Sequence, residues 1–215
     1  MNNTKIKKMT TIAMLAAFAY VSTLLIRIPV VLFLKYDPKD IIITLGGLIY
    51  GPATSLIVAI IVALAEMITI SDTGIIGMIM NILSSCAFAC TASLIYRHKK
   101  TIGNAICGLI CGCIVTTAVM ILWNYLITPV YMNVDRNVVV QLLVPYILPY
   151  NLLKTSLNAV IVFLLYKPVV KTLRYIGFAS QSEEKNHKNN SFYAIIGIIL
   201  LATIILLMLV LKGVI

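Results

Sequence analysis

The sequence predicts an all-α integral membrane protein, built as a six-helix bundle with a seventh transmembrane helix at the C-terminal end. The first observation is composition: of the 215 residues, 61% are hydrophobic and only 11% are charged, and mean hydropathy is +1.03. The second is distribution, because the apolar residues gather in six or seven stretches, most of them near the ~20 residues that cross a bilayer. Almost nothing remains for a soluble domain, so we expect one membrane domain.

The positions of the basic residues predict the orientation of the chain. If the N-terminus is cytoplasmic, eleven of the 17 Lys and Arg residues fall inside, five fall outside, and Lys154 lies within a span. The inner eleven are Lys5, Lys7, Lys8, Arg97, Lys99, Lys100, Lys167, Lys171, Arg174, Lys185 and Lys188. Cytoplasmic loops are enriched in basic residues. This bias explains the net charge of +10, so we expect a multi-pass protein of the cell membrane, a cytoplasmic N-terminus and no nucleic-acid partner.

The first apolar segment runs from about Met9 to Arg27 and is rich in alanine. It follows a basic start that resembles a signal peptide, but the run is long and has no clear cleavage site, so we expect a retained helix. Ala13 and Ala17 form a pair of small residues four positions apart, which lets another helix approach closely. The composition leaves open whether that helix belongs to this chain or to another subunit.

The loop from Ile28 to Asp40 is apolar at its start and charged at its end. Such a loop could close over a ligand as a lid, or pack on the helices as a plug. The second segment then runs from Ile41 to about Tyr50, and a Gly-Pro turn predicts that the third segment lies antiparallel to it.

The third segment, from Ala53 to about Ile70, contains Glu66 near its outer end. With the polar residues 71–74, Glu66 is interpreted as part of a solvated outer corner. The fourth segment, from Ile75 to Tyr96, contains an asparagine and two serines within NILSS that could bond across helices or face a cavity.

The fifth segment, from Ile102 to about Pro129, carries the sequence WNY near its outer end. Trp123 and Tyr125 are typical of aromatic residues at a membrane interface. Asn124 between them is harder to explain by the interface, because a side-chain amide at this depth needs hydrogen-bond partners.

The sixth segment follows an outer loop over residues 130–143 and contains Asn151, Lys154 and Asn158, which share one face of a helix. We place the start of this helix near Pro145 and Pro149, since proline suits a first turn. An ionisable group inside a bilayer costs roughly 2.5–3.5 kcal/mol and usually faces a cavity or a partner. The pattern therefore predicts a polar ligand site, although snorkelling of Lys154 to the interface is an alternative.

The predicted organisation has three parts. Residues 1–178 form a substrate-binding transmembrane domain, residues 179–191 a polar linker, and residues 192–215 an extra C-terminal transmembrane helix. The stretch from Phe192 to Leu211 carries no charge and is typical of a lipid-facing span.

Several classes of chemistry find no support in the sequence. It contains no GxxxxGK[ST] loop for ATP, no HExxH and no GxSxG, so we expect neither an enzyme nor a cofactor or metal site. The five cysteines lie within apolar segments without a CxxC pair, which indicates small residues at helix contacts rather than disulfides or metal ligands. A self-sufficient pump is not indicated, because Glu66 is the one acidic residue within a predicted span.

An ordered set of short stretches resembles one family. The stretches are AMLAAFAYV, LKYDPKDI with GGLIYGP, NILSS, WNY and PYNLLKTSLNAV, within residues 9 to 175. Together they are similar to the S components of energy-coupling factor (ECF) vitamin transporters, in particular the riboflavin-specific S components.

The resemblance implies a six-helix bundle that binds riboflavin near its outer face and docks on a membrane scaffold subunit with two ATP-binding subunits. The family's ligand contacts fall on Asn124, Asn151 and Lys154, and its docking residues on Ala13 and Ala17. Asp40 or Tyr36 is expected to have a lesser, loop-positioning role. An S component for a different vitamin, or a structural membrane subunit, is the alternative, and an intramembrane lipid enzyme lacks the required residues.

Overall fold

A computed structural model describes residues 3–31, 34–175 and 190–211. The helices are α1 (Asn3–Leu25), α2 (Lys39–Tyr50), α3 (Pro52–Thr69), α4 (Gly74–His98), α5 (Ile102–Met132), α6 (Arg136–Leu142), the π-helix η1 (Leu143–Ile147), α7 (Leu148–Tyr175) and α8 (Asn190–Leu211). The strands are β1 (Ile28–Val31) and β2 (Leu34–Tyr36). Because α6, η1 and α7 follow one another without a break, the predicted six-helix bundle with an additional helix, α8, is confirmed.

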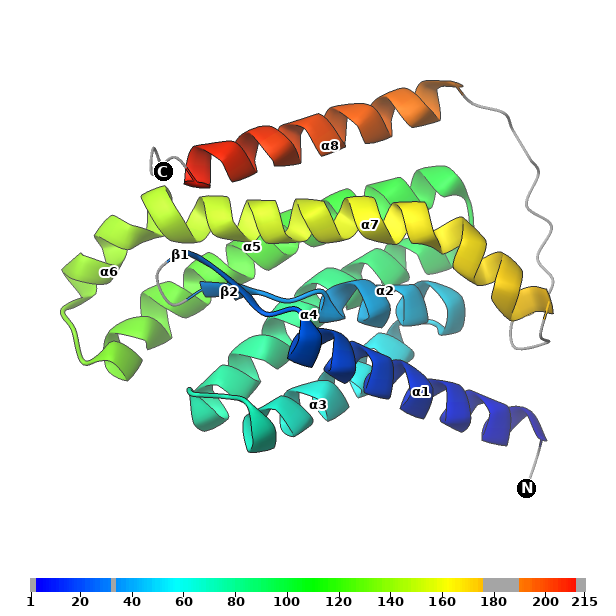
Figure 1. Cartoon of the computed structure of the whole chain (residues 1–215), viewed down its shortest axis with the longest axis horizontal. Helices are drawn as coiled ribbons and strands as arrows, with labels where there is room; N and C mark the ends of the chain where they lie inside the picture. Colours follow the sequence, from blue (N-terminus) through cyan, green and yellow to red (C-terminus); the bar gives the residue numbers. More distant parts are fainter. Residues whose placement is uncertain (1–2, 32–33, 176–189, 212–215) are drawn as a thin grey trace.

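Five described stretches are long and apolar enough to cross a membrane, which makes this a multi-pass chain. They are Ile6–Leu25, Pro52–Thr69, Gly74–His98, Ile102–Met132 and Arg136–Tyr166. The N-terminal end of α1 and the C-terminal end of α7 lie at one end of the bundle, while β1, β2 and α6 lie at the other (Figure 1). We call the second of these the hairpin end.

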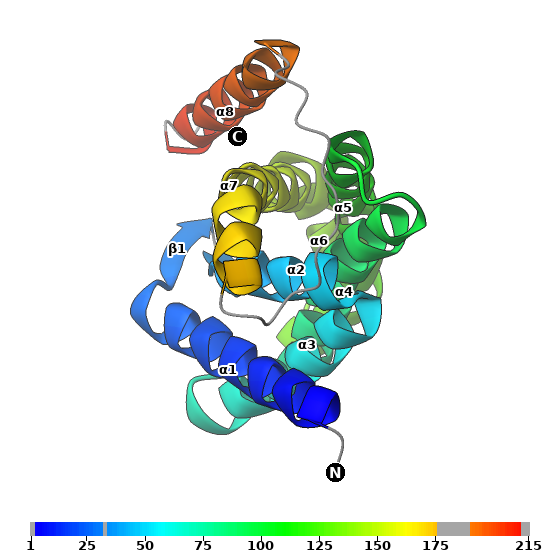
Figure 2. The same ribbon diagram turned by 90° about the vertical axis from the view of Figure 1, so that its right-hand side faces the viewer.

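Helix α2 has only 12 residues, yet it occupies the centre of the bundle and packs against α1, α3, α4 and α7 (Figure 2). Its glycines permit this: a Cβ on Gly47 would collide with the hydroxyls of Ser55 on α3 and Ser93 on α4. Gly51 then adopts φ +99, a left-handed conformation open to glycine, and Pro52 begins α3. The predicted tight turn between antiparallel neighbours therefore forms as expected.

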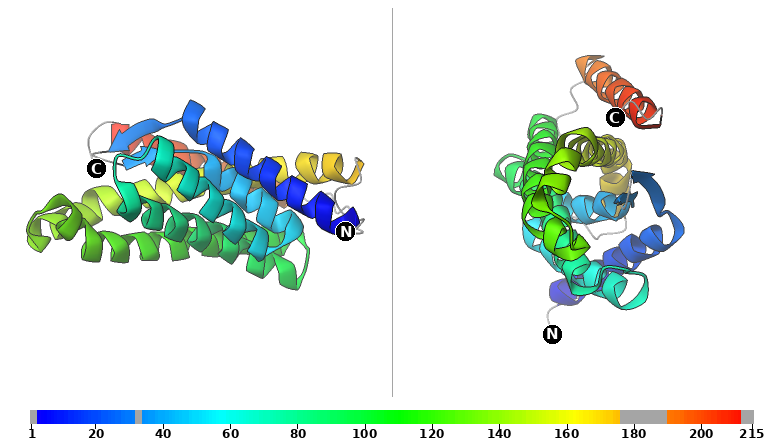
Figure 3. Two further views of the ribbon diagram at one scale, coloured as in Figure 1. Left: turned by 90° about the horizontal axis from the view of Figure 1, so that it is seen from below. Right: turned by 90° about the vertical axis from the view of Figure 1, so that its left-hand side faces the viewer.

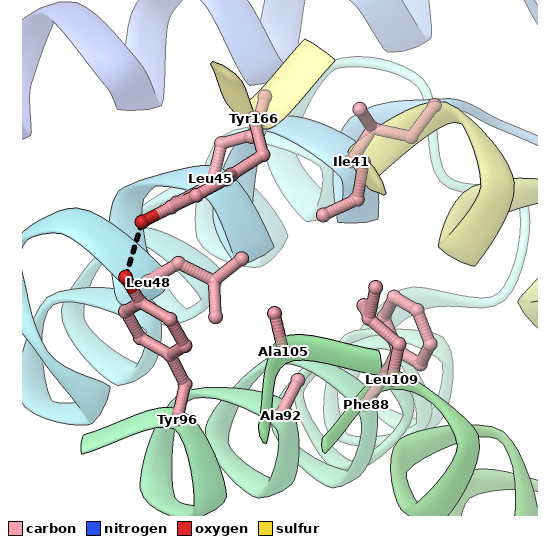
Figure 4. Packing of buried hydrophobic residues seen from close by; sticks show 10 residues of the cluster. Ile41, Leu45, Leu48, Phe88, Ala92, Tyr96, Ala105, Leu109 and Tyr166 are labelled. Carbon is pink, nitrogen blue, oxygen red and sulfur yellow. Dashed lines mark hydrogen bonds between the residues drawn. The ribbon is translucent and has the colours of Figure 1, made fainter. Parts of the chain in front are cut away.

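Away from the hairpin end, buried side chains of α2, α4, α5 and α7 form a continuous apolar core (Figure 4). Leu45 and Leu48 of α2 meet Ala92 of α4 in this core. The hydroxyls of Tyr96 on α4 and Tyr166 on α7 hydrogen-bond to each other inside it. The pairing gives each of these buried hydroxyls a hydrogen-bond partner.

The start of the sixth segment differs from the prediction. Residues 136–142 are helical, so the expected outer loop over residues 130–143 shrinks to a short connection after Asn133, which ends α5 in a left-handed conformation with φ 53. Pro145 does not begin a helix; instead, the helix widens into η1, where the N–H of Leu148 donates to the carbonyl of Leu143, five residues back. Proline lacks a backbone donor, and the π-turn absorbs this defect within a continuous helix.

The loop after α1 forms a two-stranded antiparallel hairpin, in which Ile28 pairs with Tyr36. It is held on the bundle by α7: Leu34 packs against Ile147 and Tyr150, and the Tyr150 hydroxyl donates to the carbonyl of Lys35 at 2.7 Å. Viewed from this end, the hairpin lies on one side of α7 (Figure 3).

Helix α8 packs against α7, on the opposite side of the bundle from α1 (Figures 1 and 2). The predicted linker, residues 179–191, falls almost entirely outside the described residues.

Candidate functional site

A cavity of about 410 Å³ opens within the hairpin end of the bundle. Its walls come from the end of α1, the hairpin, the start of α2, the end of α3 with the connection to α4, and helices α4, α5 and α7. Apolar side chains of α4 and α5 supply part of the lining, among them Met80, Met120 and Trp123. Polar side chains from α2, α3 and α7 face the same space, so the cavity offers both apolar surface and hydrogen-bonding groups.

One wall contains a buried ion pair between α2 and α3. The Lys39 ammonium lies 2.6 and 2.9 Å from the two carboxylate oxygens of Glu66, which is only 3% exposed. Asn81 of α4 donates to the same carboxylate at 2.9 Å. Three helices therefore converge on one carboxylate, and all three side chains line the cavity.

A second cluster surrounds Lys154 on α7, which is 7% exposed. Its Nζ lies 3.3 Å from Asp40 Oδ2 and 3.5 Å from Asp37 Oδ2. The other oxygen of Asp40 accepts a hydrogen bond from the Ser85 hydroxyl of α4. Asp37 also lies 3.7 Å from Lys39 Nζ, so it joins the two clusters.

Tyr36 and Asp37 lie between the spans, and their ionisation follows from these neighbours. Burial raises the pKa of the Tyr36 hydroxyl to about 12, so it stays protonated and donates to Asn158 Oδ1 at 3.0 Å. Burial alone would also raise the pKa of the Asp37 carboxyl, but the ammonium groups of Lys154 and Lys39 outweigh it and hold that pKa below its usual value. Asp37 is therefore an ionised carboxylate at neutral pH.

The structure brings three of the predicted ligand residues to one cavity. Asn124, Asn151 and Lys154 all line it, from α5 and α7. Asn124 donates to the Met120 carbonyl and accepts from the Thr128 hydroxyl. The Asn151 side-chain N–H donates to the carbonyl of Ile147, and within the described part of the chain its side-chain oxygen, Oδ1, accepts no hydrogen bond.

The other predicted residues lie elsewhere. Asp40 and Tyr36 are buried beside the cavity without lining it: Asp40 contacts Lys154, and Tyr36 contacts Asn158. Ala13 and Ala17 are exposed on the outer surface of α1, whereas the neighbouring Ala16 is buried against the bundle.

Two interpretations of charged residues from the sequence were wrong. Glu66 is buried in an ion pair rather than solvated in an outer corner, because Lys39 and Asn81 supply donors for its carboxylate. The alternative that Lys154 snorkels to the interface also fails, since two carboxylates hold its ammonium inside the bundle.

The sequence prediction missed Asp37 and Lys39 as cavity residues. Both belong to the charged end of the predicted loop before α2, and an acidic and basic run directly before an apolar helix is the signal in the sequence that could have pointed to them. Asn81, the asparagine of NILSS, both bonds across helices and lines the cavity, so the two alternatives given for it hold together. Within the described ranges, no group of three or more His, Cys, Asp or Glu side chains is arranged to hold a metal ion.

Comparison with known proteins places the chain in a family. Residues 7–166 match the family model described as the substrate-specific component of ECF transporters. The riboflavin transporter RibU of Staphylococcus aureus (strain TCH60) is 30% identical over 181 residues, covering 79% of this chain and 94% of the relative. The riboflavin transporter FmnP of Bacillus subtilis (strain 168) is 26% identical over 185 residues, covering 79% and 97%.

Among solved structures, the chain is similar to the one described as the S component of a bacterial ECF transporter, with a TM-score of 0.68 and 29% sequence identity. That match covers 79% of this chain and 99% of the solved chain. The chain is thus a multi-pass membrane protein that belongs to the ECF transporter family as a substrate-specific component.

Proposed function

We propose that the chain captures riboflavin from outside the cell and delivers it for uptake as the S component of an ECF transporter. The observation that carries the proposal is the cavity at the hairpin end, where Asn124, Asn151 and Lys154 come together beside an apolar wall. Two relatives whose names specify riboflavin transport support the choice of ligand.

The chemistry of riboflavin suits this cavity. Riboflavin is uncharged and combines a flat tricyclic ring with a chain of hydroxyl groups. Apolar side chains such as Met80 and Trp123 can cover the faces of the ring, as in most small-molecule pockets. The volume of about 410 Å³ falls in the range of about 300–1,000 Å³ typical of such pockets.

Each polar residue has a role that its contacts support. The side-chain oxygen of Asn151 is open to a donor on the ligand, and Lys154 can donate to ring or ribityl oxygens. Asn124 keeps one N–H and one lone pair for the ligand after its bonds within α5. Asp40 and Tyr36 act indirectly, because Asp40 holds the ammonium of Lys154 and Tyr36 anchors the hairpin to Asn158.

Transport requires partners, because the sequence contains no ATP-binding loop of its own. We propose that a membrane scaffold subunit and two ATP-binding subunits supply the energy, and that the scaffold docks on α1 at Ala13 and Ala17. Both alanines are exposed, and their small side chains let a second helix approach closely at these two positions. Helix α8 lies on the other side of the bundle and leaves this face open.

The orientation that fits this function has a cytoplasmic N-terminus, with the cavity near the outer face. Arg97 lies in the last turn of α4, and Lys99 and Lys100 follow this helix, at the end opposite the hairpin. The enrichment of cytoplasmic loops in positive charge supports placing this end inside the cell. An epitope tag on the N-terminus should be protected from protease in right-side-out vesicles and cleaved in inverted ones.

Reconstituted transport tests the proposal. Proteoliposomes that contain this chain, the scaffold and both ATPases should accumulate labelled riboflavin when ATP is supplied on the cytoplasmic side. Omission of any one subunit should abolish accumulation, and excess unlabelled thiamine or biotin should not compete. Accumulation of labelled thiamine or biotin, with no accumulation of labelled riboflavin, would instead indicate an S component for another vitamin.

A further inference from the structure

The buried charged residues around the cavity are not matched one to one, whereas Arg27, Lys35 and Asp72, which also line it, are exposed to solvent. Asp37, Asp40 and Glu66 contribute three carboxylates, while Lys39 and Lys154 contribute two ammonium groups. Each lysine has one nearest carboxylate: Lys39 lies 2.6 Å from Glu66, and Lys154 lies 3.3 Å from Asp40. Asp37 is left as the third carboxylate, at 3.5 and 3.7 Å from ammonium groups that already have closer partners.

Asp37 is also incompletely hydrogen-bonded. Its residue is 8% exposed, and its Oδ1 has no hydrogen-bond partner in the part of the chain that the structure describes. A buried carboxylate oxygen without a donor is unfavourable, because the hydrogen bonds it made to water are lost without replacement. Asp40 and Glu66 differ in this respect, since Ser85 donates to the first and Lys39 and Asn81 donate to the second.

The position of Asp37 points to what completes it. Asp37 lines the cavity together with Asn151 and Lys154. Rotation about its Cβ–Cγ bond exchanges the two oxygens, so one can face a donor in the cavity while the other stays near the lysines. A neutral donor fits this place better than a cation, because the lysines on either side would repel a positive charge.

We propose that Asp37 is a further binding residue, which accepts a hydrogen bond from an uncharged O–H or N–H group of the captured ligand. The inference rests on the proposed function, in which that ligand is riboflavin. Riboflavin carries two kinds of such donor, the ribityl hydroxyls and the ring N3–H. A carboxylate acceptor at this place gives a higher affinity for a ligand that carries a donor there than for an otherwise equal ligand that does not.

Titration of two analogues against two variants tests the assignment. The analogues are lumiflavin, which lacks the ribityl hydroxyls, and N3-methylriboflavin, which lacks the ring N–H. Affinities come from flavin fluorescence on titration with detergent-purified full-length protein. The test variant is Asp37→Asn, and the matched control is Asp135→Asn, an exposed aspartate before α6 that does not line the cavity.

We expect Asp37→Asn to weaken riboflavin binding by about tenfold or more, since it removes the charge from a charge-assisted hydrogen bond. For the analogue that lacks the donor bound by Asp37, the wild type and Asp37→Asn should bind with nearly equal affinity. That analogue therefore identifies the group that Asp37 binds. Asp135→Asn should bind all three flavins like the wild type. If Asp37→Asn does not fold, Asp37→Glu replaces it as the test variant. Its displaced carboxylate should weaken the binding of riboflavin more than the binding of the analogue that lacks the donor.

Other results would overturn the assignment. An equal loss for riboflavin and both analogues would show that Asp37 acts only on the structure of the site, through Lys154. Unchanged riboflavin affinity in Asp37→Asn would exclude the hydrogen bond outright. Wild-type protein that binds no flavin would instead refute the proposed function, and the assignment of Asp37 with it.

Discussion

The ammonium of Lys39 and the carboxylate of Glu66 form a buried ion pair, 2.6 Å apart at the closest, that joins the start of α2 to α3 beside the cavity. Both side chains are almost wholly buried, and Asn81 of α4 completes the arrangement. The pair fixes the position of a short central helix whose first residues also carry Asp40 towards Lys154. The wall of the cavity and the packing of α2 therefore depend on the same contact.

Glu66→Gln should destabilise the protein. The substitution leaves Lys39 buried without its main counter-charge, and breaking a buried pair in this way typically costs about 3–5 kcal/mol. Thermal unfolding in detergent measures the effect. The control is Asp72→Asn, which removes the exposed partner of Lys35 and should cost only about 0–1 kcal/mol. Similar small losses in both variants would mean that the buried pair contributes no more than the surface pair.

Asn151→Ala and Asn158→Ala should separate binding from structure. Both asparagines are buried on the same face of α7, but Asn151 lines the cavity while Asn158 holds the hydroxyl of Tyr36. Asn151→Ala should weaken riboflavin binding about tenfold, because it loses a hydrogen bond to the ligand. Asn158→Ala should mainly lower the unfolding temperature. The reverse pattern, measured by titration and thermal unfolding of both variants, would argue against Asn151 as a ligand contact.

Leucine at Ala13 or Ala17 should block uptake without weakening riboflavin binding. These alanines are exposed, so a larger side chain obstructs a docking helix but not the bundle. Ala16→Leu is the matched control, since Ala16 is buried and overpacking there should cost about 1–3 kcal/mol of stability. Uptake and affinity are measured on the same preparations. A fall in affinity in Ala13→Leu would place that residue in internal packing instead of docking.

The pH dependence of stability should reflect Asp37. The pKa of the Asp37 carboxyl is lower in the native state than in the unfolded state, so the unfolded state takes up a proton first as pH falls. The stabilisation by the ionised carboxylate is therefore complete above the unfolded-state pKa of about 3.9 and is lost progressively below it. Between pH 8 and 5, Asp37 should contribute no pH dependence. Unfolding midpoints from pH 3 to 8 should fall more steeply below about pH 4 in the wild type than in Asp37→Asn. Parallel curves for the two proteins would contradict this linkage.

Removal of residues 179–215 should leave riboflavin affinity unchanged. Helix α8 packs on the outside of α7 and, among the described residues, contributes no side chain to the cavity. Titration of the shortened and full-length proteins compares the two affinities directly. A large loss of affinity in a folded, shortened protein would mean that residues 1–178 are not a sufficient binding domain.

The sequence alone predicted the bundle and three cavity residues, because both follow from local patterns. Apolar length marks the spans, and Asn151 and Lys154 stand out as polar side chains within one of them. The continuous helix through Pro145 could not be predicted, since proline normally begins or breaks a helix and only the π-turn of η1 accommodates it here.

The ion pairs were also beyond the sequence. Lys39 and Glu66 are 27 residues apart, and Asp37 and Lys154 are 117 apart, so no helical or strand periodicity links them. Asp37 and Lys39 resemble loop residues in the sequence, and the positions of Glu66 and Lys154 within spans do not identify their partners. Only the packing of α2 against α3 and α7 brings the partners together inside the bundle.

The measurement that tests the central claim most directly is the titration of purified protein with riboflavin, thiamine and biotin. We expect flavin absorption bands in protein purified from cells supplied with riboflavin, and saturable binding of riboflavin with no binding of the other two vitamins. Folded, colourless protein that binds thiamine or biotin, and not riboflavin, would contradict riboflavin capture while leaving membership of the ECF transporter family intact.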